Sequence, residues 1–191
     1  MKETEITVQV YESIQQLHEK LLNNNFTLAE KCVMEDYYFS KFDISELKNM
    51  SYKQILKNSI LVRKCEDDTK IVYKNKEIDN DNNVICEEKI TLPITDIKPA
   101  IKIFELSGLN NWCNITQEMY LYKNNKMEFM VQVVDGLGIF IEYEEDESVA
   151  HLDPKEKMNV MAESLKLLGL NIGTDFSVKK VYQKFLKENN L

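Results

Sequence analysis

The chain has few residues that interrupt regular structure: 5 glycines and 3 prolines among 191 residues. This scarcity excludes a collagen-like or low-complexity chain, in which both residues are abundant. Cysteine is also scarce, and the 4 cysteines form no CxxC pair, which argues against a zinc site or a dithiol redox motif. We expect these cysteines to be reduced, partly buried thiols.

Long apolar runs and excess positive charge are missing as well. No apolar stretch is long enough to span a bilayer, and the opening MKETEITVQV lacks the apolar segment of a signal peptide, so we expect a cytoplasmic protein. Lysine and arginine number 24 against 32 aspartates and glutamates, a net charge of −8. Nucleic acid and anionic membranes repel such a chain, so neither is an expected partner. A polyanionic ligand would need a local basic pocket or a metal ion.

The length and the residue periodicity predict a single α+β domain over residues 1–191. Period-two alternation predicts eight strands, at 3–10, 33–40, 59–65, 69–75, 84–92, 115–122, 127–134 and 139–145. Helical spacing and capping residues predict helices at 11–24, 51–57, 95–107, 153–169 and 177–189. Hairpin turns join most of the strands, which favours an eight-stranded antiparallel barrel or strongly curved sheet with helices packed outside. Eight strands can enclose one small ligand.

Two pairs of carboxylates lie near the two ends of this strand series. Glu3 and Glu5 are on the first strand, and Glu142 and Glu144 are on the last. Residues two apart share a strand face, roughly 6–7 Å from each other. If both faces pointed into one barrel, the four carboxylates would converge and would suit Mg²⁺ or Mn²⁺. Alternatively, both strands turn these faces to water.

Two basic residues also end apolar strand runs. Arg63 follows Ile60-Leu61-Val62, and Lys74 follows Ile71-Val72-Tyr73. Inside a barrel, either residue could bind phosphate. The alternative is that each side chain points to solvent from a strand end, as most lysines and arginines do.

These features occur in an order that resembles the CYTH, or triphosphate tunnel, family. That family includes class IV adenylate cyclases, thiamine triphosphatases and inorganic triphosphatases, and its fold is an eight-stranded antiparallel tunnel. Its opening motif is ExExK, and its closing strand follows a GLG turn and reads like FxExE. The matching segments here cover nearly the entire chain: residues 3–7, 35–39, 60–63, 71–74, 136–144 and 180–186.

The resemblance implies a metal-dependent triphosphate hydrolase or a class IV adenylate cyclase-like enzyme, with a nucleotide or another organic triphosphate as its small-molecule partner. It assigns Mg²⁺ or Mn²⁺ to Glu3, Glu5, Glu142 and Glu144, and the phosphates to Arg63 and Lys74. Glu88, Thr7 and Gln132 are further candidates for the tunnel wall.

The departures from the family pattern fall mainly on charged positions. Thr7 replaces the lysine of ExExK, Leu61 replaces the first arginine of an LRxR-like phrase, and Gln132 replaces an aspartate before the GLG turn. Lys89 and Lys102 are candidate substitutes for the missing bases. Each lost charge-assisted contact would weaken phosphate binding by about 1.5–3 kcal/mol. Two functions therefore stay open: an enzyme of weak or lost activity, and a non-catalytic barrel that binds a phosphorylated ligand, a cation or a protein.

Overall fold

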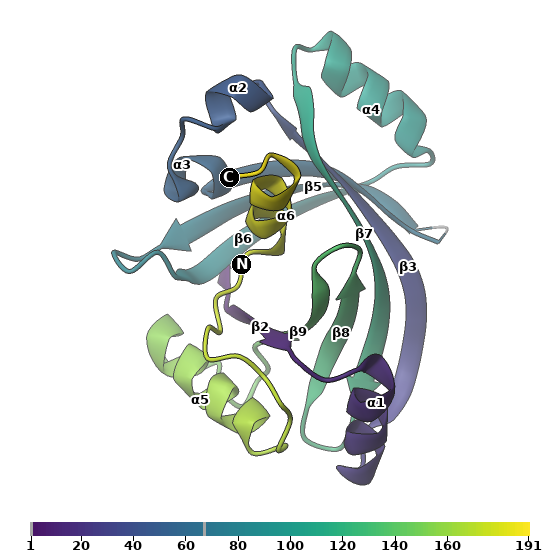
Figure 1. Cartoon of the computed structure of the whole chain (residues 1–191), viewed down its shortest axis with the longest axis vertical. Helices are drawn as coiled ribbons and strands as arrows, with labels where there is room; N and C mark the ends of the chain where they lie inside the picture. Colours follow the sequence, from purple (N-terminus) through teal and green to yellow (C-terminus); the bar gives the residue numbers. More distant parts are fainter. Residues whose placement is uncertain (1, 67) are drawn as a thin grey trace. The chain divides into compact units, whose positions relative to one another are not determined.

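The computed structural model describes residues 2–66 and 68–191, and this part of the chain has the expected α+β composition (Figure 1). The strands are β1 (Lys2–Glu3), β2 (Glu5–Val10), β3 (Thr27–Ser40), β4 (Asn58–Cys65), β5 (Asp68–Ile78), β6 (Val84–Pro93), β7 (Asn110–Lys123), β8 (Glu128–Val134) and β9 (Gly138–Glu144). The helices are α1 (Ile14–Asn23), α2 (Ile44–Leu47), α3 (Tyr52–Leu56), α4 (Ile97–Leu106), α5 (Pro154–Lys166) and α6 (Lys180–Glu188). None of these helices is both long and apolar enough to cross a membrane.

All nine described strands belong to one sheet, in the order β1-β6-β5-β4-β3-β7-β8-β9-β2. Its two ends, β1 and β2, are consecutive in the chain, so the strand order returns on itself as the predicted antiparallel barrel requires. The expected count of eight strands is one too low because the N-terminal strand breaks at Thr4. There, the Thr4 N–H donates to the Glu145 carboxylate at 2.8 Å, and the Glu145 N–H donates to the Thr4 carbonyl at 2.9 Å.

The chain divides into two compact units, which we describe separately. The first contains residues 2, 33–116 and 180–191 of the described chain, and the second contains residues 3–32 and 117–179. The long strands β3 and β7 contribute to both units. The sequence analysis missed the first half of β3 and the whole of α2, whose single turn is too short for a periodic signal.

In the second unit, alternation along β2 separates an apolar face from a polar one. Ile6, Val8 and Val10 are buried in a core that also contains residues of α1, α5, β8 and β9. Capping boxes start both helices, at Ser13 and at Asp153, and the second was predicted from the sequence. Because α1 and α5 cover the apolar face, the other side chains of β2 occupy the opposite face of the sheet.

Residues 171–178 cover the edge of β2 that β9 leaves open. A sheet edge without such cover exposes unpaired N–H and C=O groups. The backbone bonds are Tyr11 N–H to Asn171 O at 2.9 Å, Gly173 N–H to Gln9 O at 2.8 Å, Thr7 N–H to Phe176 O at 3.0 Å and Val178 N–H to Thr7 O at 3.1 Å.

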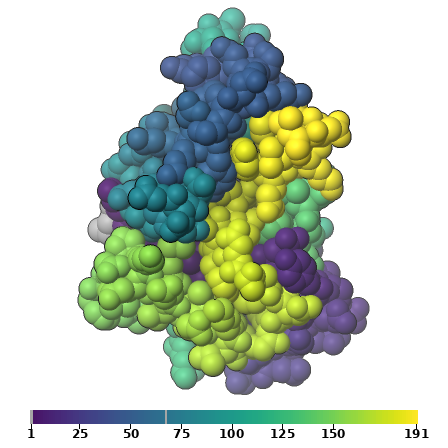
Figure 2. Space-filling view, turned by 60° about the vertical axis from the view of Figure 1, so that its left-hand side comes forward, coloured from purple at the N-terminus to yellow at the C-terminus, as the bar shows by residue number. Residues whose placement is uncertain are grey.

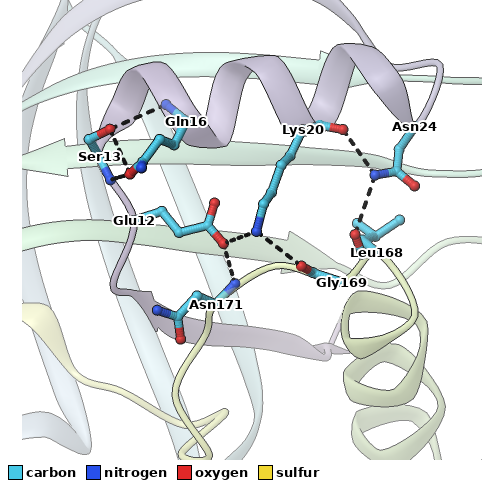
Figure 3. A network of polar contacts seen from close by, with 8 residues as sticks. All are labelled: Glu12, Ser13, Gln16, Lys20, Asn24, Leu168, Gly169 and Asn171. Carbon is cyan, nitrogen blue, oxygen red and sulfur yellow. Dashed lines mark hydrogen bonds and ion pairs between the residues drawn. The ribbon is translucent and has the colours of Figure 1, made fainter.

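A polar network anchors the start of this segment to α1 (Figure 3). The Glu12 carboxylate accepts hydrogen bonds from Lys20 Nζ, at 2.7 Å, and from the Asn171 N–H. Lys20 also donates to the Gly169 carbonyl at 3.3 Å. Burial alone would raise the pKa of Glu12, but these two hydrogen bonds outweigh it and hold the pKa below its usual value.

In the first unit, α4 covers one face of the sheet formed by β3, β4 and β5. Ala100 of α4 is buried with Phe39 and Val62, and the Phe104 ring packs edge-on against Phe39 at 5.1 Å between centroids. Because Val62 lies on this face, its neighbours Leu61 and Arg63 on β4 occupy the other one.

The closing helix α6 packs on the same unit. Its Phe185 ring meets Trp112 of β7 at 5.5 Å, and its Tyr182 ring meets Tyr52 of α3 at 5.0 Å. Aromatic edge-to-face contacts of this kind add to the hydrophobic burial that holds a short terminal helix in place.

The cysteines differ in state. Cys86 and Cys113 are buried thiols that form no disulfide, as expected. The expectation of reduced thiols is wrong for Cys32 and Cys65, which are disulfide-bonded. Sequence spacing gives no signal for such bonding, because the positions of the two cysteines on their strands decide it.

Candidate functional site

Three of the four predicted metal-binding carboxylates come together in the second unit. In the β2–β9 pair, Glu5 is opposite Glu144, and Thr7 is opposite Glu142. Opposite residues of an antiparallel pair point to the same face, and this is the face away from α1 and α5. Glu5, Glu142 and Glu144 each place one carboxylate oxygen within 4.8 Å of the other two.

The fourth carboxylate, Glu3, is not in this group. Glu3 is half-buried on β1, beyond the break at Thr4. The ExE spacing places two carboxylates on one face only while the strand continues, so the break removes the geometric reason for including Glu3.

The three grouped residues fit a hard divalent cation. All the donors are carboxylate oxygens, which Mg²⁺ and Mn²⁺ prefer over nitrogen or sulfur donors. At a metal–oxygen distance of about 2.1 Å, ligands on opposite sides of Mg²⁺ are about 4.2 Å apart. The three oxygens lie within 4.8 Å of one another, so at most a small rotation of the side chains is needed. Glu5 and Glu142 are half-buried and Glu144 is exposed, which leaves room for water or a phosphate oxygen.

A fourth acid, Glu145, joins the ends of the two strands that carry this group. Its carboxylate accepts the Thr4 N–H, and both of its oxygens accept from Lys157 Nζ of α5 at 2.9 Å. Burial would raise the pKa of Glu145, but the bonds from Lys157 and Thr4 outweigh it and lower the pKa below its usual value. The contact ties the end of β9 to the start of β2 and so keeps Glu144 beside Glu5. The sequence analysis missed Glu145, which looks like any other residue of an acidic run.

The departures Thr7 and Gln132 are neutral and almost fully buried. Thr7 is 2% exposed and lies opposite Glu142, whereas Gln132 of β8 is 1% exposed and lies opposite Phe140. Gln117 of β7 shares their face, and its buried Oε1 accepts no hydrogen bond from the described residues. At Thr7 and Gln132, where the family pattern has charged residues, this face therefore has neutral polar groups.

The first unit contains a cluster of basic residues around one buried acid. Lys74 Nζ lies 3.0 Å from the Glu87 carboxylate, and Lys76 Nζ and Lys89 Nζ each lie 3.3 Å from it. Glu87 is 2% exposed. Lysine ammonium groups give charge-assisted hydrogen bonds to phosphate oxygens, so this cluster is a candidate phosphate site. Lys76 was not predicted, since it lies in a run of alternating charges that also fits a solvated strand.

Arg63, the other predicted phosphate-binding residue, pairs with a buried acid. Its Nε and Nη2 both donate to the Asp36 carboxylate at 2.7 Å, across the β3–β4 pair. Asp36 is 2% exposed, so this bidentate pair satisfies an otherwise isolated buried charge. Two of the Arg63 donor groups are therefore committed to the fold.

Two of the sequence candidates are not part of the basic cluster. Glu88 is exposed and lies opposite Asn75, on the other face of β5–β6. The acid beside the lysines is its neighbour, the buried Glu87. Lys102 is exposed on α4, with Nζ 3.5 Å from Glu105. Of the two proposed substitute bases, only Lys89 belongs to the cluster.

Comparisons with known proteins agree with this geometry. The chain is 27% identical over 183 residues to the Methanocaldococcus jannaschii protein named "Putative adenylate cyclase MJ0240", and the match covers 95% of this chain and 97% of that protein. A solved structure of a conserved hypothetical protein from Pyrococcus furiosus matches with a TM-score of 0.71 and 18% identity, over 94% of this chain and 98% of the other. A Vibrio parahaemolyticus structure described as a "putative adenylate cyclase" has a TM-score of 0.61 and 14% identity, over 97% of both chains.

No protein-family model matches the chain. The two solved structures are below 25% identity and so support the fold alone, whereas the curated relative adds similarity of sequence over nearly the whole length. Together, these findings confirm the resemblance shown by the ordered motifs and point to the CYTH, or triphosphate tunnel, family for this chain.

Proposed function

We propose that this protein binds a small-molecule triphosphate together with Mg²⁺ or Mn²⁺ and cleaves or cyclises it. The observation that carries this proposal is the group formed by Glu5, Glu142 and Glu144, with one oxygen from each within 4.8 Å of the others. Three carboxylates so close repel one another unless a cation or a proton neutralises them. The similarity to a protein named "Putative adenylate cyclase MJ0240" supports the choice of a triphosphate.

In this proposal each residue group has one task. Glu5, Glu142 and Glu144 hold the cation, which when bound neutralises phosphate charge. Lys74, Lys76 and Lys89 donate to the phosphate oxygens, and Glu87 holds the three ammonium groups close together.

The cluster around Glu87 also bears on the missing bases. A triphosphate carries about four negative charges, and its reactions depend on positioning and on charge neutralisation. Lys76 of β5 and Lys89 of β6 are two bases, the same number as is missing at Thr7 and Leu61, although they lie on other strands. The proposal therefore does not require a lysine in the opening motif.

The test is ³¹P NMR of the full chain with excess Mg²⁺ and, separately, ATP, thiamine triphosphate and inorganic triphosphate. A Glu142→Gln, Glu144→Gln double variant removes two of the proposed metal ligands. A Glu147→Gln, Glu163→Gln variant is the matched control, since it removes the same charge at exposed positions outside the group. A third variant, Lys74→Gln with Lys89→Gln, tests the basic cluster.

Each outcome has a defined meaning. New orthophosphate signals that are lost in the two site variants but not in the control support a hydrolase, and cyclic AMP with pyrophosphate supports a cyclase. Broadened or shifted phosphate signals without turnover overturn the catalytic part and favour the non-catalytic binding barrel. Spectra that do not change at all overturn the triphosphate proposal.

A further inference from the structure

A cavity lies in the first unit, between α3 and the β5–β6 hairpin. Its volume is about 340 Å³, within the range of small-molecule sites. Figure 2 shows the α2–α3 segment, in blue, beside the teal β5–β6 hairpin. Two contacts join these elements: Lys53 Nζ donates to the Asp79 carbonyl, and the Lys76 N–H donates to the Lys57 carbonyl at 2.8 Å. The cavity is lined by Lys2, Lys53, Lys57, Asn75, Lys76, Glu77, Ile78 and Cys86.

This cavity is on the other face of β5–β6 from the basic cluster around Glu87. Lys74 and Lys76 alternate along β5 with Asn75 and Glu77, so the two pairs point to opposite faces. Glu77 is opposite Cys86 in the β5–β6 pair, and the Cys86 Sγ–H donates to the Glu77 carboxylate at 3.4 Å. The side chains of Asn75, Glu77 and Cys86 therefore belong to the α3 side. Lys76 lines the cavity, but its ammonium group is 3.3 Å from Glu87.

Some of the lysines at the cavity have a carboxylate partner and others do not. Its one carboxylate, Glu77, is paired with Lys2 Nζ at 2.8 Å, and the hydrogen bond from Lys2 holds the pKa of Glu77 below its usual value. Lys53 donates to a neutral carbonyl rather than to an acid. Lys57 makes no ion pair or side-chain hydrogen bond within the described part of the chain. Two ammonium groups therefore lie at one cavity without a carboxylate partner.

We propose that this cavity binds a small phosphate-bearing anion through Lys53 and Lys57, with the Asn75 amide as a further hydrogen-bond donor. Phosphate oxygens accept charge-assisted hydrogen bonds from ammonium groups, which are roughly twice as strong as neutral ones. The short α3 helix places the two lysines four residues apart, on one side of a helical turn. This site is separate from the triphosphate site of the proposed function.

The experiment is a titration of the full chain, labelled with ¹⁵N, with inorganic pyrophosphate in the presence of EDTA. The Asn75 side-chain NH₂ signal is the reporter, because that side chain lies on the α3 face. We expect it to shift in the parent protein and in a Lys74→Gln, Lys89→Gln variant, which weakens only the opposite face. In a Lys53→Gln, Lys57→Gln variant, the dissociation constant read from this signal should rise about tenfold or more.

A Lys98→Gln, Lys102→Gln variant is the matched control, because it removes the same charge from exposed positions of α4. It should bind pyrophosphate as the parent does. Three results would overturn the proposal: no shift of the Asn75 signal, unchanged affinity in the Lys53→Gln, Lys57→Gln variant, or loss of the shift in the Lys74→Gln, Lys89→Gln variant. Circular dichroism of each variant confirms that it is folded, and glutamine keeps a helix propensity close to that of lysine. The triphosphate proposal is unaffected by any of these results.

Discussion

Replacing Glu142 with glutamine tests the metal site without relying on activity. The substitution keeps the shape of the side chain but removes one charge and one ligand from the group of Glu5, Glu142 and Glu144. The carboxylate oxygens lie within 4.8 Å of one another, and at that upper limit two charges repel by about 0.9 kcal/mol in a water-like medium and by about 3.5 kcal/mol at an effective dielectric constant of 20. Glu144 is exposed, so the lower value applies to its pairs.

A cation that relieves this repulsion should stabilise the folded protein. At a Mg²⁺ concentration ten times the dissociation constant, the expected gain is about 1.4 kcal/mol. For a chain of this length that gain corresponds to a rise in Tm of about 3–6 °C. If Glu142→Gln weakens binding tenfold, the gain at the same Mg²⁺ concentration falls to about 0.4 kcal/mol, or about 1 °C.

Differential scanning calorimetry with and without Mg²⁺ measures this difference directly. Glu147→Gln is the control, because Glu147 is an exposed acid of the same unit outside the group, and its Mg²⁺ response should equal that of the parent. An equal rise in Tm for the parent and for Glu142→Gln would refute the reasoning. Each protein must first be compared with itself in EDTA, since the substitution also changes the metal-free stability.

Three further predictions concern ionisable groups elsewhere. The pKa of Glu145 is lowered in the folded protein, so its contact with Lys157 stabilises the fold at neutral pH, and this stabilisation is lost as the pH falls through the folded-state pKa. Glu145→Gln should therefore lower the free energy of unfolding, measured with urea at pH 7, by about 1–3 kcal/mol. The same variant should lose less stability than the parent when the pH is lowered. Asp36→Asn should lower the unfolding free energy by about 2–3 kcal/mol, because it breaks the bidentate ion pair with the half-buried Arg63 guanidinium, and an unchanged urea midpoint would contradict this. Burial raises the pKa of Cys113 to about 12, so mass spectrometry should find it unmodified by iodoacetamide at pH 8 in the native protein and alkylated after unfolding.

Local sequence patterns were sufficient for the elements and for much of the metal group. The alternation along residues 3–10 correctly separated a buried face from the face of Glu5 and Thr7, because period-two geometry is a property of the strand itself. The cap and proline at Asp153-Pro154 located the start of α5 for the same kind of local reason. The order of the motifs along the chain then indicated the resemblance to the CYTH, or triphosphate tunnel, family.

Contacts between distant segments were not accessible in this way. Whether Glu87 or Glu88 faces the lysines depends on strand register, since a shift of one residue reverses the face of every side chain. The strand break that separates Glu3 from the group depends on Glu145, which lies 141 residues away from Thr4.

The sequence alone thus determined most of the strand and helix pattern, the acidic balance, and the pair of carboxylates on the closing strand that share one face. Only the tertiary structure decided which charges meet: Arg63 with Asp36, and three lysines with Glu87. The physical reason is that propensity and periodicity act over a few neighbouring residues, whereas ion pairs and buried polar contacts depend on which strands lie side by side.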